Sequence, residues 1–198
     1  MRAAILDYGS GNLHSLARAV RSSGSVPIIT ADVKEALACD VLLLPGVGAF
    51  GSAAASIASR LDPLRSALSD GMPCLGICLG MQLLFDSSEE GEGQGLGVIA
   101  GSVRRMRTER VPHMGWNSLD DRRDPILLHS ALETAYFANS YACVPADTSV
   151  VTAWTVHESE RFPAAVRAGN VVGVQFHPEK SSSAGVRFVA AFLAEARK

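Results

Sequence analysis

The chain has 198 residues, of which 47% are hydrophobic and 19% are charged, a composition typical of a folded protein rather than a disordered one. The formal net charge is −2, so no overall positive field points to a nucleic acid or an anionic membrane as a partner. No apolar run approaches the roughly 20 residues of a membrane helix, and the start of the chain lacks the features of a signal peptide. We therefore expect a cytoplasmic protein that forms a single domain over residues 1–198.

The first half of the chain alternates strand and helix patterns, as expected for a parallel sheet covered by helices. Asp32 should cap one helix, and Pro63 should break or kink another. Apart from Asp40, the run over residues 40–46 is apolar, as a strand buried on both faces should be. Strands are predicted over residues 2–8, 26–30, 40–46 and 73–78, and helices over residues 12–24, 32–38, 52–71 and 79–88.

The second half of the chain carries shorter strand patterns, followed by one amphipathic helix over residues 182–198 with a Ser cap. The turn at residues 168–170 predicts a hairpin within residues 164–176. Other strand-like pieces lie at residues 97–106, 135–143 and 149–157. The fold class is therefore α/β, with a mostly parallel central sheet flanked by helices and additional antiparallel strands in the C-terminal half.

The four cysteines, Cys39, Cys74, Cys78 and Cys143, are irregularly spaced. Cys74 and Cys78 are four residues apart, which is not the CxxC spacing of a redox or zinc motif, and no second pair completes a ligand set. We predict no metal site and no cofactor. Disulfides are also not expected in a cytoplasmic protein.

Cys78 lies in the sequence Gly-Ile-Cys-Leu-Gly, where a predicted strand becomes a helix. This arrangement is typical of a nucleophile elbow, in which a strained turn projects the nucleophile above the sheet and side chains on the flanking residues would clash. The backbone N–H of Leu79 then lies where an oxyanion would develop. The alternative is a buried core thiol, with Gly76 and Gly80 only easing the packing of the helix on the sheet.

His177 ends a strand pattern and is followed by Pro178, which favours an extended backbone at the histidine. In an extended chain, residues i and i+2 share a face, so Glu179 should lie beside His177 and orient its imidazole. A solvent-exposed strand end is the alternative for His177 considered alone. Together with Cys78, the pair predicts a Cys-His-Glu catalytic triad.

The buried strand at residues 40–46 ends in Pro45-Gly46-Val47-Gly48, a turn that can point backbone N–H groups into a cleft. A second oxyanion donor is expected there, from Val47 or Gly48. Nucleotide binding is disfavoured, because His14 stands where a dinucleotide fingerprint needs glycine and no Walker lysine is present.

Taken together, the segments PGVGAF, GICLGMQLLF and GVQFHPEKS resemble the class I (triad) glutamine amidotransferases over essentially the whole chain. Within that class, DYGSGNLHS, VPHMGWN and YFANSY look like the glutaminase subunit of imidazole glycerol phosphate synthase of histidine biosynthesis. The resemblance implies a flavodoxin-like fold and hydrolysis of L-glutamine to glutamate and ammonia. It assigns catalysis to Cys78, His177 and Glu179, and oxyanion binding to backbone N–H groups of Val47, Gly48 and Leu79.

The resemblance also implies substrate contacts by Gly46, Gln82, Ser140 and Tyr141. Without it, Gln82 could equally be an exposed helix residue. The sequence departs from the family at Asn139, where a histidine usually precedes the serine; this leaves the contact made at position 139 open.

Ammonia would pass, again by resemblance, to a (β/α)₈ cyclase subunit in a heterodimer. A predicted loop over residues 111–117 offers His113, Trp116 and Asn117 to that partner; the alternative for Trp116 is a buried core residue. Further interface candidates are Asn12, Tyr136 and Lys180. Rival functions are another amidotransferase or thiol hydrolase on the same fold, and a non-enzymatic flavodoxin-like binding module.

Overall fold

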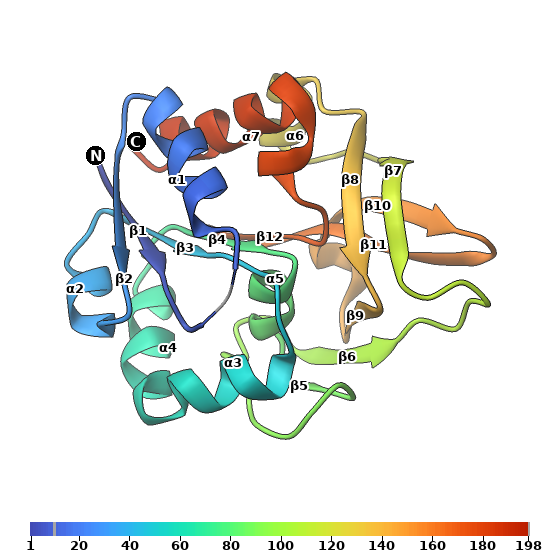
Figure 1. The fold of residues 1–198 in the computed structure, drawn as a ribbon, viewed down its shortest axis with the longest axis horizontal. Coiled ribbons are helices and arrows are strands. Elements are labelled where there is room, and N and C mark those ends of the chain that lie inside the picture. Colours follow the sequence, from blue (N-terminus) through green and yellow to red (C-terminus); the bar gives the residue numbers. More distant parts are fainter. Residues whose placement is uncertain (10, 198) are drawn as a thin grey trace.

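The computed structural model describes residues 1–9 and 11–197, which are built around a seven-stranded sheet with the order β10-β11-β12-β4-β3-β1-β2 (Figure 1). The five strands from β12 to β2 run parallel, and β10 and β11 continue the sheet as antiparallel strands. The strands are β1 (Arg2–Leu6), β2 (Val26–Thr30), β3 (Val41–Leu44), β4 (Cys74–Ile77), β10 (Val151–His157), β11 (Glu160–Ala168) and β12 (Val171–Val174).

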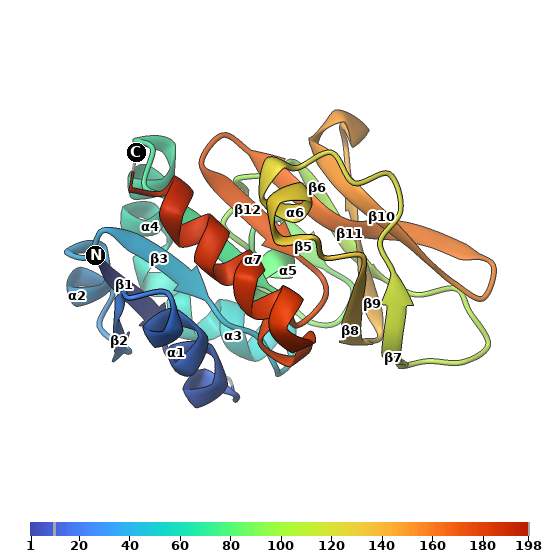
Figure 2. The same ribbon diagram turned by 90° about the horizontal axis from the view of Figure 1, so that it is seen from above.

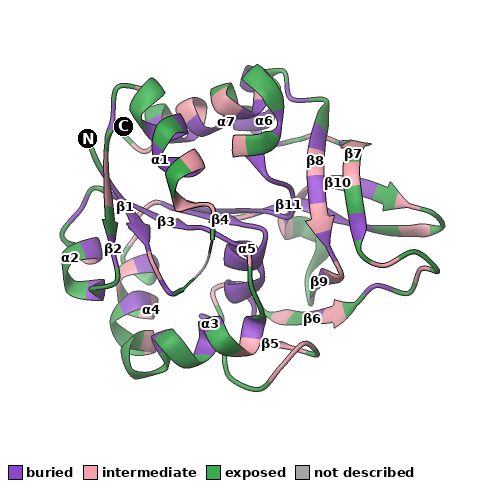
Figure 3. Ribbon diagram, in the orientation of Figure 1, coloured by how far each residue is buried: buried purple, intermediate pink, exposed green. Residues whose placement is uncertain are grey.

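Helices cover both faces of this sheet (Figures 1 and 2). Successive residues of β1 alternate between the two faces: Ala3 and Ile5 join one hydrophobic cluster, and Ala4 and Leu6 join the other. The central strands are consequently buried along their whole length, as Figure 3 shows. One face carries α1 (Leu13–Ser22), α6 (Pro125–Ser130) and α7 (Ser182–Glu195); the other carries α2 (Val33–Leu37), α3 (Phe50–Ile57), α4 (Leu61–Ser69) and α5 (Leu79–Leu83).

Two small sheets lie beside the antiparallel end of the main sheet (Figure 1). One consists of β5 (Ser87–Ser88), β6 (Gly101–Arg105) and β9 (Tyr141–Pro145). The other is an antiparallel ribbon of β7 (His113–Ser118) and β8 (Thr134–Asn139). Three short 3₁₀ helices, η1 (Ala58–Arg60), η2 (Thr148–Val150) and η3 (Pro178–Lys180), complete the described elements.

The strands and helices predicted for the parallel half are present, and Asp32 accepts a capping hydrogen bond from the N–H of Lys34, but two helices differ from the prediction. The helix predicted over residues 79–88 ends at Leu83, and Ser87–Ser88 form the strand β5. The pattern over residues 52–71 forms α3 and α4 with η1 between them. Pro63 lies in the first turn of α4, where its missing N–H has no helical partner to lose. The break therefore falls before the proline.

Three predictions for the C-terminal half are wrong in detail. Residues 113–118 form β7 rather than a loop, and the strand pattern over 135–143 is two strands separated by Ser140. Ser181 holds the N-cap position of α7 without a side-chain capping bond, because its hydroxyl is engaged elsewhere. Among residues 1–9 and 11–197, no helix is long and apolar enough to cross a membrane.

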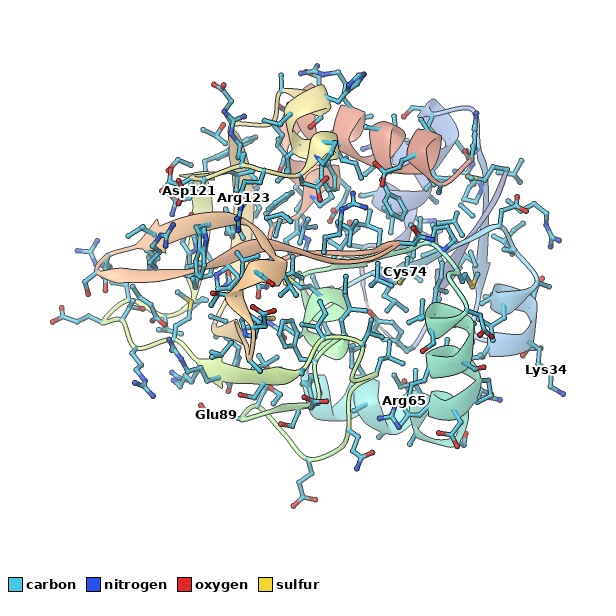
Figure 4. The ribbon with its side chains drawn as sticks, turned by 180° about the vertical axis from the view of Figure 1, so that it is seen from behind. Lys34, Arg65, Cys74, Glu89, Asp121 and Arg123 are labelled. Atoms are coloured by element: carbon cyan, nitrogen blue, oxygen red, sulfur yellow. The ribbon has the colours of Figure 1, made fainter. Side chains whose placement is uncertain are left out.

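All four cysteines are buried and unpaired. Cys74 lies inside β4, within the central sheet (Figure 4), and burial raises the pKa of its thiol far above the ordinary value. Cys74 is therefore a core residue, as its position in the predicted strand indicated. Burial likewise raises the pKa of Cys143, and the nearby Cys78 adds to that effect.

Candidate active site

The three segments that carry the predicted catalytic and oxyanion-binding groups follow the carboxyl ends of three adjacent parallel strands. The neighbours β12, β4 and β3 are followed, respectively, by residues 175–179, by Cys78 and by the turn at residues 45–48. In the sheet, Val174 lies opposite Ile77, and Leu44 lies opposite Gly76, so the three strand ends are level. The carboxyl ends of parallel strands are the usual place for a ligand site in an open α/β sheet.

Cys78 occupies the strained turn that the sequence predicts, with φ 53° and ψ −104°. Its backbone N–H donates to the carbonyl of Val174, at 2.7 Å. A Cβ on Gly80 would collide with the carbonyl oxygen of Leu44, and one on Gly76 would lie 2.6 Å from the carbonyl oxygen of Gly80. The two glycines therefore allow the backbone to turn sharply enough to bring the thiol to the end of the sheet.

His177 and Glu179 make the predicted contact: Nδ1 of the imidazole lies 2.9 Å from Oε1 of the carboxylate. The backbone between them is not extended as predicted, because Pro178 starts the 3₁₀ turn η3. Both side chains are buried, with 1% and 4% of their surfaces exposed. Asn12 donates from Nδ2 to the same Oε1, at 2.6 Å, so the carboxylate is held from two sides.

The backbone of His177 is fixed to β8 through Ser181. The N–H of His177 donates to the carbonyl of Tyr136, at 2.8 Å. The Ser181 hydroxyl donates to the carbonyl of His177, at 2.6 Å, and accepts from the N–H of Tyr136, at 2.9 Å. These bonds fix the backbone of His177 against Tyr136, in the middle of β8.

The electrostatics of His177 favour its protonated form. Burial alone lowers the pKa of His177, but the Cys78 sulfur and the Glu179 carboxylate outweigh burial and raise the pKa to about 9. The second ring nitrogen, Nε2, is buried and has no hydrogen-bond partner within the described ranges. The Cys78 sulfur and the Glu179 carboxylate thus both stabilise a positive charge on the imidazole, an environment suited to activating a neighbouring thiol.

Cys78 opens into a cavity of about 180 Å³. Most residues predicted from the sequence for oxyanion and substrate binding lie on its wall, as does Asn139. Gln82 is 5% exposed, so it is not the exposed helix residue that the alternative required. The lining consists of Val47, Gly48, Cys78, Leu79, Gln82, Glu90, Ala138, Asn139, Ser140 and Tyr141.

The turn at residues 45–48 packs directly on the nucleophile turn. A Cβ on Gly46 would collide with the backbone of Ile77 and lie 2.5 Å from the nitrogen of Leu79. Gly48 has φ +143°, a conformation that side chains rarely adopt. Gly46 itself does not line the larger cavity; with His177 and Glu179 it borders a second one of about 10 Å³ behind the triad.

Two polar residues of the site were not predicted from the sequence. Glu90 lines the cavity and its Oε2 accepts from the N–H of Phe50, at 2.8 Å, but nothing distinguished it from its neighbours Glu89 and Glu92 in a glycine-rich stretch. Gln175 is fully buried and contacts Cys78. Its alternation with Val174 and Phe176 placed it on the same face as His177, a signal that could have identified it.

The predicted partner-contacting residues fall into two groups. Trp116 is 54% exposed, so it is not a core residue; its ring makes an edge contact with that of Tyr136, which also lies near Nζ of Lys180. These three form one surface cluster next to the triad. His113 is buried and stacks on Phe137 and His157, so its side chain does not face a docking surface.

Asn117 and Asn12 are engaged within the fold. The Asn117 amide donates to the carbonyl of Val156, at 2.7 Å, and Asn12 binds Glu179. Across the described ranges, no group of three or more histidine, cysteine, aspartate or glutamate side chains could hold a metal ion.

Comparison with known proteins agrees with this geometry. The family model "Glutamine amidotransferase class-I" matches residues 4–196. "Imidazole glycerol phosphate synthase subunit HisH" of Gloeothece citriformis is 44% identical over 202 residues, covering 98% of this chain and 96% of the relative. The protein of the same name from Synechocystis sp. is 42% identical and covers 96% and 94%.

Solved structures show the same fold at lower identity. A crystal structure of a glutamine amidotransferase superposes with a TM-score of 0.74 at 20% identity and covers 99% of both chains. A chain of PurLQS from Thermotoga maritima gives a TM-score of 0.75 at 20% identity and covers 98% of both. The chain thus belongs to the class-I glutamine amidotransferase family and, within it, is a relative of the imidazole glycerol phosphate synthase subunits HisH.

Proposed function

We propose that this chain is the glutaminase subunit of an imidazole glycerol phosphate synthase, which hydrolyses glutamine through a thioester on Cys78. The observation that carries the proposal is that Cys78, which lines a cavity of about 180 Å³, follows β4 next to the end of β12, where the buried His177–Glu179 pair lies and His177 feels the charge of Cys78. The full-length similarity to the HisH relatives supports the substrate and the pathway.

In the first step, the Cys78 thiolate attacks the side-chain carboxamide carbon of glutamine and forms a C–S bond. The carbonyl oxygen becomes an oxyanion. Nε2 of the His177 imidazolium then gives its proton to the amide nitrogen, the C–N bond breaks, and ammonia leaves. Glu179 accepts a hydrogen bond from Nδ1 throughout, which keeps Nε2 directed at the reacting atoms.

In the second step, neutral His177 takes a proton from water as the water oxygen attacks the thioester carbon. The second tetrahedral intermediate collapses, the C–S bond breaks, and glutamate leaves. Cys78 returns to the thiolate and His177 to the imidazolium. The raised pKa of His177 favours the imidazolium at the start and end of the cycle.

The oxyanion in both steps would be bound by backbone N–H groups of Leu79 and of Val47 or Gly48, all of which line the cavity. The amino-acid end of glutamine carries an ammonium and a carboxylate. Glu90 supplies a carboxylate that can pair with the ammonium, and Gln82, Ser140 and Tyr141 supply polar groups around the rest of the substrate.

The partner would be a (β/α)₈ cyclase subunit that receives the ammonia. The exposed cluster of Trp116, Tyr136 and Lys180 supports docking beside the triad, because Lys180 directly follows Glu179 in η3. Trp116→Ala should weaken binding of the cyclase at least tenfold, as truncation of a central aromatic residue commonly does. The matched control is Leu128→Ala, since Leu128 is a similarly exposed apolar residue on α6.

A cytoplasmic location is inferred from the cysteines. All four are unpaired, and one of them must stay a thiolate for the proposed reaction, which suits a reducing compartment.

The test is release of glutamate from glutamine, with and without a cyclase subunit and its nucleotide ligand. We expect weak activity of the chain alone, strong activation by the liganded cyclase, and complete loss in Cys78→Ala. Cleavage of simple esters or peptides without cleavage of glutamine would instead indicate a different thiol hydrolase. Undiminished activity of Cys78→Ala would favour a binding module and reject the proposal.

A further inference from the structure

Gln175 lies against the nucleophile and has no role in the reaction described so far. It directly follows β12, and its backbone N–H donates to the carbonyl of Ala164 in β11, at 2.9 Å. Its side chain is fully buried, and Nε2 lies 3.5 Å from the Cys78 sulfur. A buried amide next to a reacting atom must satisfy both its oxygen and its nitrogen, so the groups around it determine which end meets the sulfur.

The orientation of Gln175 follows from a chain of neighbours. Nε2 of Gln82 lies 3.5 Å from the carbonyl oxygen of Tyr141, which can only accept a hydrogen bond. Gln82 therefore directs its NH₂ group into this network. The same nitrogen lies 3.4 Å from Oε1 of Gln175, so each N–H of Gln82 has one acceptor. With its oxygen occupied in this way, Gln175 presents its own NH₂ group to Cys78.

We propose that Gln175 is a further catalytic residue, which donates an N–H to the Cys78 sulfur and stabilises its thiolate form. This inference deepens the proposed function and rests on Cys78 being the nucleophile. An anionic sulfur is a much stronger acceptor than a neutral thiol, so the hydrogen bond favours the ionised state. His177 supplies the neighbouring positive charge, and Gln175 supplies a fixed neutral donor that never gives up its proton.

The contact also bears on the second step of the reaction. When the thioester forms, the sulfur loses its charge and becomes a poor acceptor. When the thioester is hydrolysed, the charge returns to sulfur as the C–S bond breaks. The N–H of Gln175 stabilises the departing Cys78 thiolate, because the hydrogen bond strengthens as negative charge develops on the sulfur.

The experiment measures alkylation of Cys78 by iodoacetamide as a function of pH, using the complete chain and peptide mapping to separate Cys78 from the three other cysteines. This assay needs neither glutamine nor a partner. Gln175→Met keeps the side-chain length but removes the donor. Its matched control is Gln94→Met, which makes the same change at an exposed position.

We expect alkylation of Gln175→Met near neutral pH to be about tenfold slower than in the wild type, in line with the loss of a hydrogen bond to a charged group. The whole pH profile should move to higher pH and reach the wild-type rate at its alkaline plateau. Gln94→Met should be unchanged. An unmoved profile, or an equal loss of rate at every pH, would overturn the proposal and leave Gln175 a structural residue.

A second variant covers the case in which Gln175→Met does not fold. Gln175→Glu keeps the oxygen that accepts from Gln82 but replaces the donor with a carboxylate, so its profile should move further in the same direction. A wild-type profile in Gln175→Glu would also overturn the proposal. If the pH profiles of Cys78 alkylation shift in the Gln175 variants but the wild-type protein does not hydrolyse glutamine, the proposed function is wrong and the inference about Gln175 is still supported.

Discussion

Nδ2 of Asn12 lies 2.6 Å from Oε1 of Glu179, so a residue at the start of α1 orients the carboxylate near the end of the chain. Oε1 accepts from Asn12 and from His177 at once. Asn12 has φ 71°, a left-handed conformation in which asparagine and glycine are the favoured residues. Asparagine therefore suits both the backbone conformation and the hydrogen bond to Glu179. The sequence predicted Asn12 only as a partner-interface residue, so this contact is an additional role.

Replacing Asn12 with glycine tests this role, because glycine keeps the backbone conformation and removes only the side chain. We expect kcat for glutamine to fall about tenfold at a saturating concentration of cyclase, the cost of losing a hydrogen bond to a charged group. Asn12→Asp should be worse, since it sets a second carboxylate beside Glu179. If Asn12 served only the partner, Asn12→Gly would weaken the complex yet keep the wild-type kcat at saturation.

Glu179→Gln should lower the pKa of His177, which stands at about 9 in the wild type. The carboxylate is one of the two groups that raise this pKa, and a neutral amide cannot replace its charge. Titration of the His177 ring by NMR gives the midpoint directly in both proteins. We expect kcat to fall at least 100-fold. An unchanged midpoint would show that the Cys78 sulfur alone holds the proton on His177.

Gly48→Ala should reduce kcat about 100-fold or more while the protein stays folded. The new methyl group would lie 3.5 Å from the Leu79 side chain, which is ordinary contact, so the obstacle is the backbone at φ +143°. Relief of that strain would turn the adjoining peptide groups away from the position that an oxyanion takes, and loss of one such donor typically costs about 10²–10³ in rate.

The control for Gly48 is Gly169→Ala, at an exposed turn with φ +56° and open space around it. That change should cost about 1 kcal/mol of stability and leave kcat unaltered. Steady-state kinetics and thermal unfolding of both variants make the comparison. A Gly48→Ala enzyme with normal kcat would exclude this turn from oxyanion binding.

His113 should make the fold sensitive to acid. Burial lowers the pKa of His113 to about 4, with a further contribution from His157, whereas the unfolded chain takes up this proton near 6.5. Between these values the unfolded state binds more protons, so the free energy of unfolding should fall as the pH drops from 6.5 to 4. The loss would reach no more than about 3 kcal/mol.

Urea unfolding at several pH values measures this effect. His113→Phe keeps a ring beside Phe137 and Phe162 but cannot titrate, so its stability should decline less over the same interval. His129→Phe is the control, because His129 is exposed on α6. Parallel declines in His113→Phe and the wild type would assign the acid sensitivity to other groups.

The parallel half of the fold and the contact between His177 and Glu179 were predictable because each rests on a local pattern. Apolar runs, glycines around Cys78, and a histidine two residues before a glutamate are all visible along the chain. The 3₁₀ turn between His177 and Glu179 shows that a correct contact can follow from the wrong backbone conformation, since both arrangements bring residues i and i+2 together.

The remaining features depend on contacts across the fold. Residues 111–117 were expected to form a loop, but pairing with β8 makes residues 113–118 a strand. Glu90 and Asn12 carry no local signal, because their partners lie 40 and 167 residues away in sequence. Only tertiary structure reveals such roles.

The order of strands in the sheet has a consequence for how the protein is made. Cys78 directly follows β4, and β12, which pairs with β4 and precedes His177, is the last strand that the structure describes. A nascent chain that has emerged only through α5 therefore contains Cys78 but not His177 or Glu179. On the proposed mechanism, activity requires β12 to pair with β4, so a translation product that stops before β12 should be unable to release ammonia.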